Sequence, residues 1–269
     1  MNEQSIMTNA DPAPGMAGAG GEYVRPSGMH YLRFLRRLHE TCLFDWYFEV
    51  GTCTGDSLVL SRSKSIAVDP FFRVDANAIG TKPQLHAFQM GGDEFFETDF
   101  LKANKIKLDF AFLDGMHLFE YLLRDFINAE KNAKKTSVIA MHDCCPYDEA
   151  MQTRDLDNLP RGAWTGDVWK LIPILKEYRP DLTITVLDAR PTGLILVTGL
   201  NPSSKTLAGA YDEIVAEYRD MTMEAYGLEK FYSLFDFTNA RDVAQDGFKI
   251  FTPASIDPDL ALAPKKVST

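Results

Sequence analysis

The chain has 269 residues, of which 45% are hydrophobic and 25% charged, the composition of a globular protein with a sizeable core. Its net charge of −10 argues against nonspecific binding to nucleic acid or to an anionic membrane, because both repel an acidic surface. The chain has four cysteines without a CxxC pair and no apolar run of about 18 residues. Its first residues lack a basic segment followed by an apolar one, so we expect no secretory signal. These features predict a reduced, cytoplasmic protein.

The two ends of the chain differ in composition from its centre. The first residues are rich in glycine, alanine and proline and offer little to bury, so we expect a disordered leader over 1–27. Between Met29 and Phe44, leucines recur at helical intervals among arginines, which predicts an amphipathic helix. This helix and a core domain would occupy 28–200, and a C-terminal helical extension with a loose tail would fill 201–269.

From Tyr47 onward, short apolar runs alternate with amphipathic stretches, as in crossover units that build a mostly parallel sheet with helices on both faces. The expected strands are 47–51, 65–69, 85–90, 108–114, 136–142, 182–188 and 193–199. The expected helices are about 55–62, 92–104, 117–134, 166–178 and 211–226. The segment Ala189 to Gly193 is too short for a crossover, so the last two strands should form an antiparallel hairpin at the sheet edge.

The first strand leads into a glycine-containing turn, Tyr47-Phe-Glu-Val-Gly-Thr-Cys-Thr-Gly-Asp-Ser57. Gly51 and Gly55 would let the backbone approach a ligand closely, and the N–H groups of the following helix would face it. Asp69 closes the second strand twenty residues after Glu49, where its carboxylate can accept both hydroxyls of a ribose. The spacing predicts a nucleoside-bearing cofactor. The alternatives are an ordinary strand-to-helix turn for the glycines and a helix cap for Asp69.

Polar residues gather at the ends of the first five expected strands. Ligands of open parallel sheets bind beyond the carboxyl ends of the strands, so this concentration predicts a functional site there. The residues are Glu49-Val-Gly51, Asp69, Gly91-Gly-Asp93, Asp114-Gly-Met-His117 and His142-Asp143.

Over residues 45–200 the chain resembles the class I S-adenosylmethionine-dependent methyltransferases. The strand pattern with its terminal hairpin matches that family, and Glu49 to Ser57 resembles its first motif in the form E-x-G-x-x-x-G-x-S. That form is typical of the metal-dependent branch related to catechol O-methyltransferase. The resemblance implies an α/β fold, a Rossmann-like seven-stranded mostly parallel sheet with an antiparallel terminal hairpin, and S-adenosyl-L-methionine as cofactor. The cofactor-binding residues that it implies are Glu49, Gly51, Thr52, Cys53, Gly55, Ser57, Asp69, Asp93 and Asp114.

The same resemblance assigns parts of the cofactor to individual residues. Glu49 and Ser57 would line its methionine end, Asp69 would hold the ribose and Asp93 would lie near the adenine. A NAD-binding oxidoreductase is the alternative for this half of the chain. It predicts G-x-G-x-x-G after the first strand, which this sequence lacks, and the antiparallel hairpin fits it poorly.

A D-G-x-H sequence, Asp114 to His117, and an H-D pair, His142-Asp143, follow the fourth and fifth expected strands. Together they resemble a bacterial branch of methyltransferases, some of which act on sugars and natural products. In the metal-dependent enzymes, the cation ligands occupy the positions that correspond to Asp114, His142 and Asp143 of this chain. Oxygen ligands suit Mg²⁺, whereas an imidazole shifts the preference toward Mn²⁺, Fe²⁺ or Zn²⁺. The resemblance thus implies a divalent cation, Mg²⁺ or Mn²⁺.

His117 falls where the catechol-type enzymes carry their catalytic lysine. The implied reaction is in-line attack by a substrate hydroxyl on the methyl group of the cofactor, with His117 or His142 as base. A cation held partly by Asp114 would lower the pKa of the hydroxyl. We therefore expect His117, His142 and Asp114 to be catalytic. The alternatives are a capping or packing role for His117 and a structural role for Asp114.

Three further features allow more than one interpretation. Cys144 and Cys145 are expected to pack rather than bind zinc, because consecutive residues rarely both reach one tetrahedral ion. The segment Trp164 to Trp169 predicts either the rim of an acceptor pocket or a helix start anchored in the core. Glu120 and Asp125 are expected on a helix face, solvated or paired.

The sequence thus predicts an S-adenosylmethionine-dependent O-methyltransferase that acts on a small-molecule hydroxyl, on a sugar or a secondary metabolite. The expected partner is this small-molecule acceptor, with no nucleic acid and no membrane, and a homodimer through the terminal segments is compatible with the sequence. The alternative from another class is a methyltransferase-like domain without catalysis that binds or scaffolds a partner.

Overall fold

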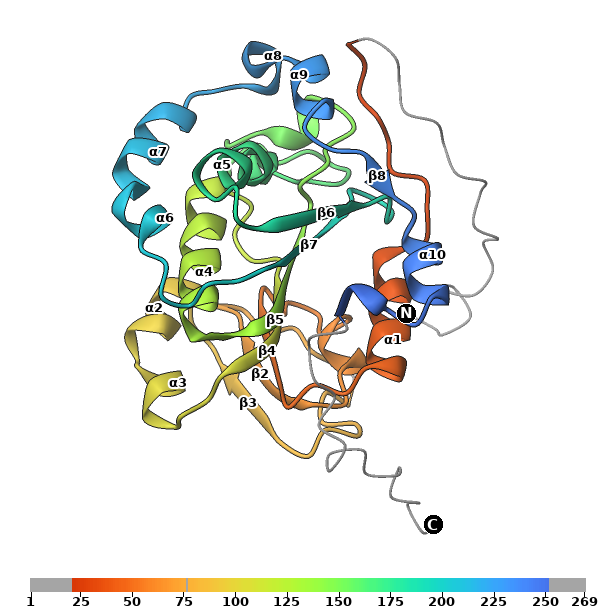
Figure 1. The fold of residues 1–269 in the computed structure, drawn as a ribbon, viewed down its shortest axis with the longest axis vertical. Helices are drawn as coiled ribbons and strands as arrows, with labels where there is room; N and C mark the ends of the chain where they lie inside the picture. Colours follow the sequence, from red (N-terminus) through yellow and green to blue (C-terminus); the bar gives the residue numbers. More distant parts are fainter. Residues whose placement is uncertain (1–20, 76, 252–269) are drawn as a thin grey trace.

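A computed structural model of the chain describes residues 21–75 and 77–251, and its fold is drawn in Figure 1. Most of the expected leader and the expected tail from Pro253 onward lie outside the described residues. None of the helices in the described part combines the length and the apolar character that crossing a membrane requires.

The last residues of the expected leader, 21–27, run along the folded body. The backbone N–H of Val24 donates to the hydroxyl of Tyr232 at 3.0 Å, and the hydroxyl of Tyr23 accepts from the side-chain amide of Gln152 at 2.7 Å. Both partners lie more than a hundred positions away in the sequence. Local composition therefore does not reveal where the leader begins to contact the body.

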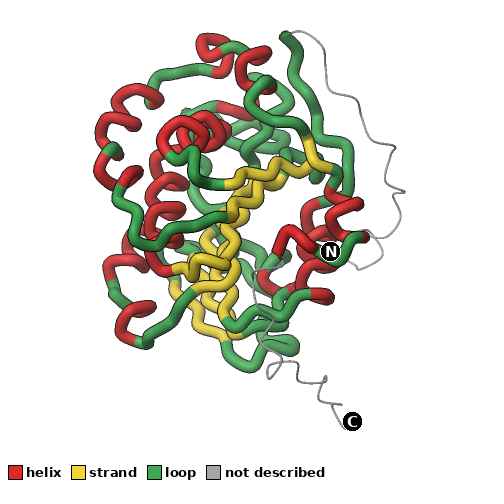
Figure 2. Tube along the Cα trace, viewed as in Figure 1, coloured by secondary structure: helices red, strands yellow, loops and turns green. Residues whose placement is uncertain are grey.

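One eight-stranded sheet forms the centre of the molecule (Figures 1 and 2). Its strands are β1 (Trp46–Val50), β2 (Lys64–Val68), β3 (Leu85–Phe88), β4 (Leu108–Leu113), β5 (Ala133–His142), β6 (Thr183–Leu187), β7 (Leu194–Thr198) and β8 (Phe237–Thr238). Their order is β3-β2-β1-β4-β5-β7-β6-β8, in which β1 to β5 run parallel and β7 runs antiparallel to both of its neighbours. The order of the first seven strands confirms the predicted Rossmann-like fold of the class I methyltransferases.

The eighth strand is not among the predicted ones. β8 pairs in parallel with the end of β6, where Val186 lies opposite Phe237 and Leu187 opposite Thr238. A strand of two residues has no detectable periodicity, so the sequence does not predict it. The hairpin of β6 and β7 consequently has a neighbour on its outer side instead of forming the sheet edge.

Helices and 3₁₀ turns cover both faces of the sheet (Figure 2). They are α1 (Tyr31–Thr41), η2 (Leu58–Leu60), α2 (Gly92–Glu97), α3 (Phe100–Ala103), α4 (Phe119–Asn132), η3 (Ala150–Gln152), η4 (Val168–Lys170), α5 (Leu171–Tyr178), α6 (Thr206–Gly209), α7 (Tyr211–Tyr218), α8 (Met223–Tyr226), α9 (Leu228–Tyr232), α10 (Ala240–Gln245) and η5 (Lys249–Phe251). In Figure 1, α1 and α10 lie together on one side of the sheet, and α4 and α5 lie on the other.

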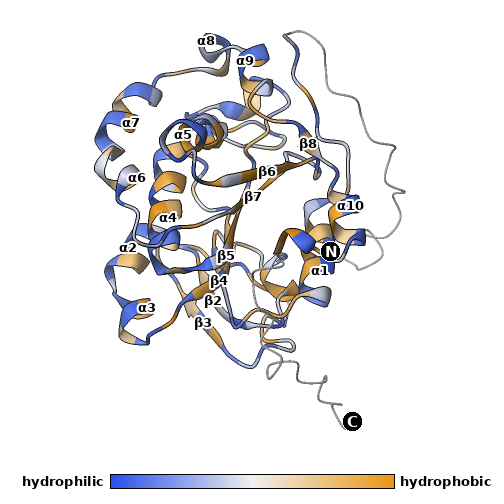
Figure 3. Cartoon of the chain, viewed as in Figure 1, coloured by the Kyte–Doolittle hydropathy of each residue, from blue (hydrophilic) through white to orange (hydrophobic). Residues whose placement is uncertain are grey.

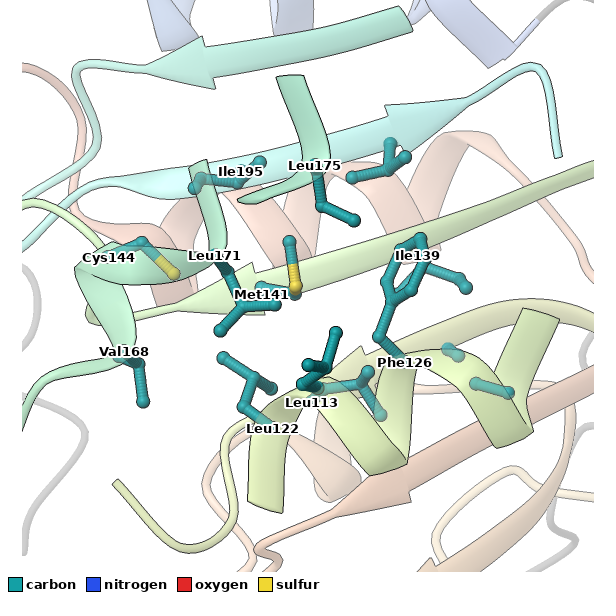
Figure 4. Close-up of a cluster of buried hydrophobic side chains, with 14 of the residues drawn as sticks. Leu113, Leu122, Phe126, Ile139, Met141, Cys144, Val168, Leu171, Leu175 and Ile195 are labelled. Atoms are coloured by element: carbon teal, nitrogen blue, oxygen red, sulfur yellow. The ribbon is translucent and has the colours of Figure 1, made fainter. Parts of the chain in front are cut away.

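Successive residues of the buried strands point to opposite faces, so each central strand contributes to two hydrophobic clusters. In β4, Leu113 joins the cluster beneath α4 and α5, whereas Phe110 and Phe112 join the cluster beneath α1. Figure 4 shows part of the first cluster, in which Leu113 lies near Leu122 and Phe126 of α4. Figure 3 shows hydrophobic colours along the central strands and mixed colours on the surrounding helices.

The sequence predicts a helix over 55–62, and the structure corrects this to the 3₁₀ turn η2. The turn ends at Ser61, whose backbone is extended and whose hydroxyl accepts from the backbone N–H of Ser63 at 3.3 Å. The hydroxyl of Ser65 donates to the carbonyl of Ser63 at 2.9 Å and lies 3.2 Å from the hydroxyl of Ser61. The glycine turn after β1 is therefore not followed by the predicted helix N-terminus.

The helix predicted over 92–104 is divided into α2 and α3. Asp99 interrupts it with a φ of 54°, a left-handed conformation that a regular helix does not contain. The hydroxyl of Thr98 donates to the carbonyl of Phe95 at 2.6 Å and so closes the end of α2. The helices expected over 166–178 and 211–226 are also present, the first with a 3₁₀ start and the second as two pieces.

Candidate active site

The turn after β1 has the tight backbone that its glycines predict. Gly51 and Gly55 have φ angles of 89° and 82°, which residues with a side chain rarely adopt. A Cβ at Gly51 would overlap the carbonyl oxygen of Asp114, so the turn packs directly against the end of β4. The turn and the D-G-x-H sequence are thus neighbours.

Glu49 lies beneath this turn and is fully buried. It accepts a short hydrogen bond from the hydroxyl of Tyr47, while its Oε1 has no partner among the described residues. Burial raises the pKa of the Glu49 carboxyl to about 7, against the opposing effect of the hydroxyls of Tyr47, Thr52 and Ser57. The free oxygen is available to a donor that enters from the turn.

Asp69, at the end of β2, connects the turn to the loop that follows. Its carboxylate accepts from the backbone N–H of Cys53 at 2.8 Å and from that of Phe71 at 2.6 Å. Each carboxylate oxygen has a second lone pair, so these bonds leave the residue able to accept from a ribose. Cys53 itself has a φ of 44°, which places it at the tip of the turn.

Asp93 occupies the first turn of α2 and is paired. Arg124 of α4 binds both of its carboxylate oxygens, with N–O distances of 2.8, 3.0 and 2.7 Å, and also donates to the hydroxyl of Tyr211. The predicted position of Asp93 near an adenine remains a prediction. Its carboxylate serves here to join α2 to α4.

The four acidic and imidazole residues predicted after β4 and β5 lie together. Nε2 of His117 lies 3.5 Å from Asp114 Oδ1 and 3.4 Å from Asp143 Oδ2. Nδ1 of His142 lies 3.4 Å from Asp114 Oδ1 and 3.3 Å from Asp143 Oδ1. Two carboxylates thus alternate with two imidazoles around a common centre. We call these four residues the His/Asp cluster.

In the His/Asp cluster, the carboxylates stabilise the charged imidazoles and the imidazoles stabilise the charged carboxylates. Burial disfavours a charged imidazole, but the carboxylates of Asp143 and Asp114 outweigh it and raise the pKa of His142 to about 10. For His117, the same opposition between burial and these carboxylates raises the pKa to about 9. Burial would raise the pKa of Asp114, but the two imidazoles overcome it and hold the pKa well below its usual range.

The His/Asp cluster also has the donor set of a divalent cation site. Ligand atoms of Asp114, His117 and Asp143 lie within 4.8 Å of one another. Asp114 Oδ1 and His142 Nδ1 are buried without a hydrogen-bond partner among the described residues, which ordinary packing avoids. Carboxylate oxygens and neutral imidazoles are ligands of Mn²⁺, Fe²⁺ and Zn²⁺. The residues therefore fit such a cation. Asp114 and Asp143, two of the three predicted ligands, belong to this group with His117, whereas the predicted ligand His142 lies beside it.

Trp164 fixes the orientation of His117. Nδ1 of His117 lies 2.7 Å from the carbonyl oxygen of Trp164, so this nitrogen must carry the proton that the carbonyl accepts. The two rings stack with centroids 4.9 Å apart. Nε2 is thereby directed to the carboxylates. Trp164 thus contacts the His/Asp cluster, and its place at the rim of an acceptor pocket stays a prediction.

The other end of the same segment belongs to the core and to the start of α4. Trp169 is buried, and Asp167 accepts from the backbone N–H of Phe119 at 2.9 Å. Asp167 also binds Arg154 at 2.6 Å, and Arg154 in turn binds Glu120 at 2.6 Å. Glu120 is therefore paired, as expected for a helix face.

Tyr31 and Thr192 belong to the site but carry no local sequence signal for it. The hydroxyl of Thr192, in the loop between β6 and β7, donates to Asp143 Oδ1 and lies 3.5 Å from His142 Nε2. The ring of Tyr31, at the start of α1, stacks on His142 with centroids 3.9 Å apart. Both reach the site through the packing of the sheet, which a local motif does not encode.

Cys144 and Cys145 are buried and unbridged. In Figure 4 the side chain of Cys144 points into the apolar cluster beside Leu171 and Val168. The sulfur of Cys145 packs against Gly193. These contacts agree with the packing interpretation of the pair.

Comparison with models of known protein families gives no match, and neither does comparison with curated protein sequences. Some solved structures are similar to this chain. An O-methyltransferase from Bacillus cereus in complex with SAH is 14% identical, with a TM-score of 0.46 over 62% of this chain and 78% of that chain. The O-methyltransferase TomG from Streptomyces achromogenes, involved in tomaymycin synthesis and in complex with SAM, is 16% identical, with a TM-score of 0.47 over 64% and 78%.

A third similar structure is a complex that contains a metal. The methyltransferase MycE from the mycinamycin biosynthetic pathway, in complex with Mg, SAH and mycinamycin VI, is 13% identical. Its TM-score is 0.41, over 65% of this chain and 49% of that chain. At these identities the likeness concerns the fold, and the residues of the site must carry the functional argument.

Proposed function

We propose that the chain is an S-adenosylmethionine-dependent methyltransferase that transfers the methyl group to a hydroxyl of a small-molecule acceptor. The observation that carries the proposal is the His/Asp cluster, which lies at the carboxyl ends of β4 and β5 beside the glycine turn of β1. In a parallel sheet with this strand order, that edge is where a cofactor and its substrate meet.

The cofactor would occupy the turn and its surroundings. Gly51 lets the backbone approach the methionine part, and the free Oε1 of Glu49 is placed to accept from its ammonium group. Asp69 would accept from the ribose hydroxyls through the lone pairs that Cys53 and Phe71 leave free. Thr52, Gly55 and Ser57 would complete the walls of this pocket, and Asp114 would lie at its far end.

The His/Asp cluster would hold a divalent cation through Asp114, Asp143 and the imidazole of His142, the ligands that the sequence predicts, and Nε2 of His117 would stay free. When bound, such a cation would lower the pKa of the acceptor hydroxyl and favour the neutral form of both histidines. The presence of imidazoles favours Mn²⁺ over Mg²⁺. Thr192 keeps the carboxylate of Asp143 in place by donating to its Oδ1.

His117 is the group best placed to act as the base. Its Nδ1 donates to the carbonyl of Trp164, so the lone pair of Nε2 points into the cluster once the ring is neutral. In the transfer, the acceptor oxygen forms a bond to the methyl carbon while the sulfur–methyl bond breaks, and the hydroxyl proton passes to His117 Nε2. His142, stacked beneath Tyr31, is more enclosed and would serve as the imidazole ligand of the cation.

The isosteric variant Asp143→Asn tests this proposal. Asp143 has a φ of 62°, and asparagine tolerates this conformation, so the variant removes the charge and keeps the backbone. We expect S-adenosylhomocysteine to bind the variant as it binds the wild type in calorimetric titration. Methyl transfer from an isotopically labelled donor to a panel of sugars, phenols and other hydroxyl acceptors should fall about 100-fold or more.

Asp109→Asn is the matched control, because Asp109 is a buried carboxylate at the opposite end of β4 that binds Lys134. Its methyl transfer should remain near that of the wild type. Absence of any affinity of the wild type for S-adenosylhomocysteine would overturn the proposal. Affinity for it without transfer to any acceptor would favour a binding or scaffolding domain.

The compartment and the assembly of the protein also belong to this proposal. All four cysteines of the chain are free, which supports a reducing, cytoplasmic location. Contact between α1 and α10 leaves the outer faces of both terminal segments on one side of the molecule, where a second copy could pair in a homodimer (Figure 1).

A further inference from the structure

Asp125 is a buried carboxyl group that the proposed mechanism does not use. It lies in α4, and only 4% of its surface is exposed. No described residue donates a hydrogen bond to its carboxyl group. Its neighbour Arg124 is committed to Asp93 and Tyr211. The small part of its surface that is exposed is therefore left to solvent or to a ligand.

The carboxyl group of Asp125 lies beside two glycines. A Cβ at Gly92, which follows β3, would overlap Asp125 Oδ1, and a Cβ at Gly115, which follows β4, would lie 3.7 Å from Oδ2. A Cβ at Gly115 would also lie 3.9 Å from the backbone nitrogen of Gly51. The carboxyl group is therefore at the carboxyl-end edge of the sheet, between the segments after β3 and β4 and beside the cofactor turn.

Asp125 is uncharged at neutral pH. Burial raises the pKa of its carboxyl to about 8, and the nearby carboxylate of Asp93 from α2 adds to this, while Arg124 from α4 opposes it. A neutral carboxyl group has one O–H donor and one carbonyl acceptor on adjacent atoms. A carboxylate has acceptors only. The group thus offers a paired donor and acceptor at an edge where a nucleoside would lie.

We propose that Asp125 recognises the adenine ring of the bound cofactor as a neutral acid, donating its O–H to a ring nitrogen and accepting from the exocyclic amino group. The inference rests on the proposed function, since it takes the nucleoside to lie along this edge. Asp93, which the sequence predicts near the adenine, is held by Arg124, whereas the hydrogen-bonding capacity of Asp125 is unused. Two adjacent hydrogen bonds of opposite direction fit the edge of adenine that carries its amino group.

The test uses two ligands of the full-length protein, S-adenosylhomocysteine and 5′-methylthioadenosine. The second has no amino-acid group, so ionisation of an α-ammonium cannot affect its binding at high pH. For the wild type, we expect the affinity for 5′-methylthioadenosine to be constant from pH 6 to about 8, and the affinity for both ligands to fall up to about tenfold per unit above that.

Asp125→Asn retains a donor and an acceptor but does not titrate. It should bind both ligands within about threefold of the wild type at pH 7 and lose the decline at high pH. Asp125→Ala should bind both about tenfold or more weakly at every pH. Asp109→Asn, the control for a buried carboxyl elsewhere in the same sheet, should keep the wild-type affinity and profile.

Three outcomes would overturn the inference. One is equal affinity of the wild type and Asp125→Ala for both ligands, and another is the same decline at high pH in Asp125→Asn as in the wild type. Either result would leave S-adenosylhomocysteine bound and the proposed function intact. The third, no binding of either ligand to the wild type at any pH, would remove the proposed function together with the inference.

Discussion

Besides its proposed role in binding, Asp125 lowers the stability of the protein as the pH rises. In the unfolded chain its carboxyl ionises with the ordinary pKa of 3.8, whereas in the fold it keeps its proton to about pH 8. The folded state therefore binds the extra proton between these values, and its stability must fall as the pH rises across that window. A residue kept at such a cost is one for which a role in binding is to be sought.

The stability of Asp125→Asn should show this cost directly. From pH 5 to pH 8 we expect the free energy of unfolding of the wild type to fall by roughly 3 kcal/mol more than that of the variant. Urea unfolding at the two pH values measures the difference. Glu49 also has a raised pKa, but it is present in both proteins, so its contribution cancels. Parallel pH profiles would contradict the buried, neutral state of Asp125.

At the scale of elements, the loop between β5 and η4 is held against the site by its last residues. Gly166 has a φ of 52°, and a Cβ there would overlap the carbonyl oxygen of His117. The carbonyl of Trp164 holds the imidazole of the same histidine. The loop thus positions both the backbone and the ring of His117, so its conformation determines where the proposed base lies.

Gly166→Ala should therefore displace the loop. We expect a loss of roughly 1–3 kcal/mol in stability and a larger fall in turnover than in affinity for S-adenosylhomocysteine. Gly162→Ala lies in the same loop, where a Cβ would meet nothing within 4 Å, and it should behave as the wild type. Thermal unfolding and calorimetric titration of the two variants make the comparison. Equal turnover in both would show that the loop does not position His117.

At the scale of the whole molecule, the C-terminal extension completes the core. Leu207, Ile214 and Phe231 belong to the hydrophobic cluster beneath α4 and α5, and Val243 and Phe248 belong to the cluster beneath α1. The extension thus covers both faces of the sheet. The division at residue 200 that the sequence predicts would cut through both clusters.

A chain shortened to residues 1–200 should consequently fail to fold cooperatively. The truncation removes several buried side chains from each cluster and exposes the apolar surface that they cover. The lost burial destabilises the fold by roughly 2 kcal/mol per large residue, which together exceeds the stability of a typical domain. Loss of a sigmoidal thermal transition, followed by circular dichroism, would agree with this expectation. A cooperative transition close to that of the full chain would establish 28–200 as an independent domain.

The central strands could be predicted because each is an apolar run whose burial is a local property of the sequence. The side chains of the His/Asp cluster were also identifiable, since Asp114, His142 and Asp143 end or directly follow such a run and His117 lies in the turn after β4. Tyr31 and Thr192 could not be, because they reach His142 across 111 and 50 positions. The environment of Asp125 escaped prediction for the same reason: it depends on Gly92, in a segment that α4 meets only in the folded chain.

The overlap between a Cβ at Gly92 and the carboxyl group of Asp125 has an evolutionary consequence. A larger residue at position 92 requires that the carboxyl group of Asp125 rotate away or that position 125 hold a smaller side chain. Conversely, where position 125 holds a residue smaller than aspartate, position 92 no longer needs to be glycine. Among relatives of this chain, the two positions should therefore change together, and a glycine at 92 should accompany the acid at 125.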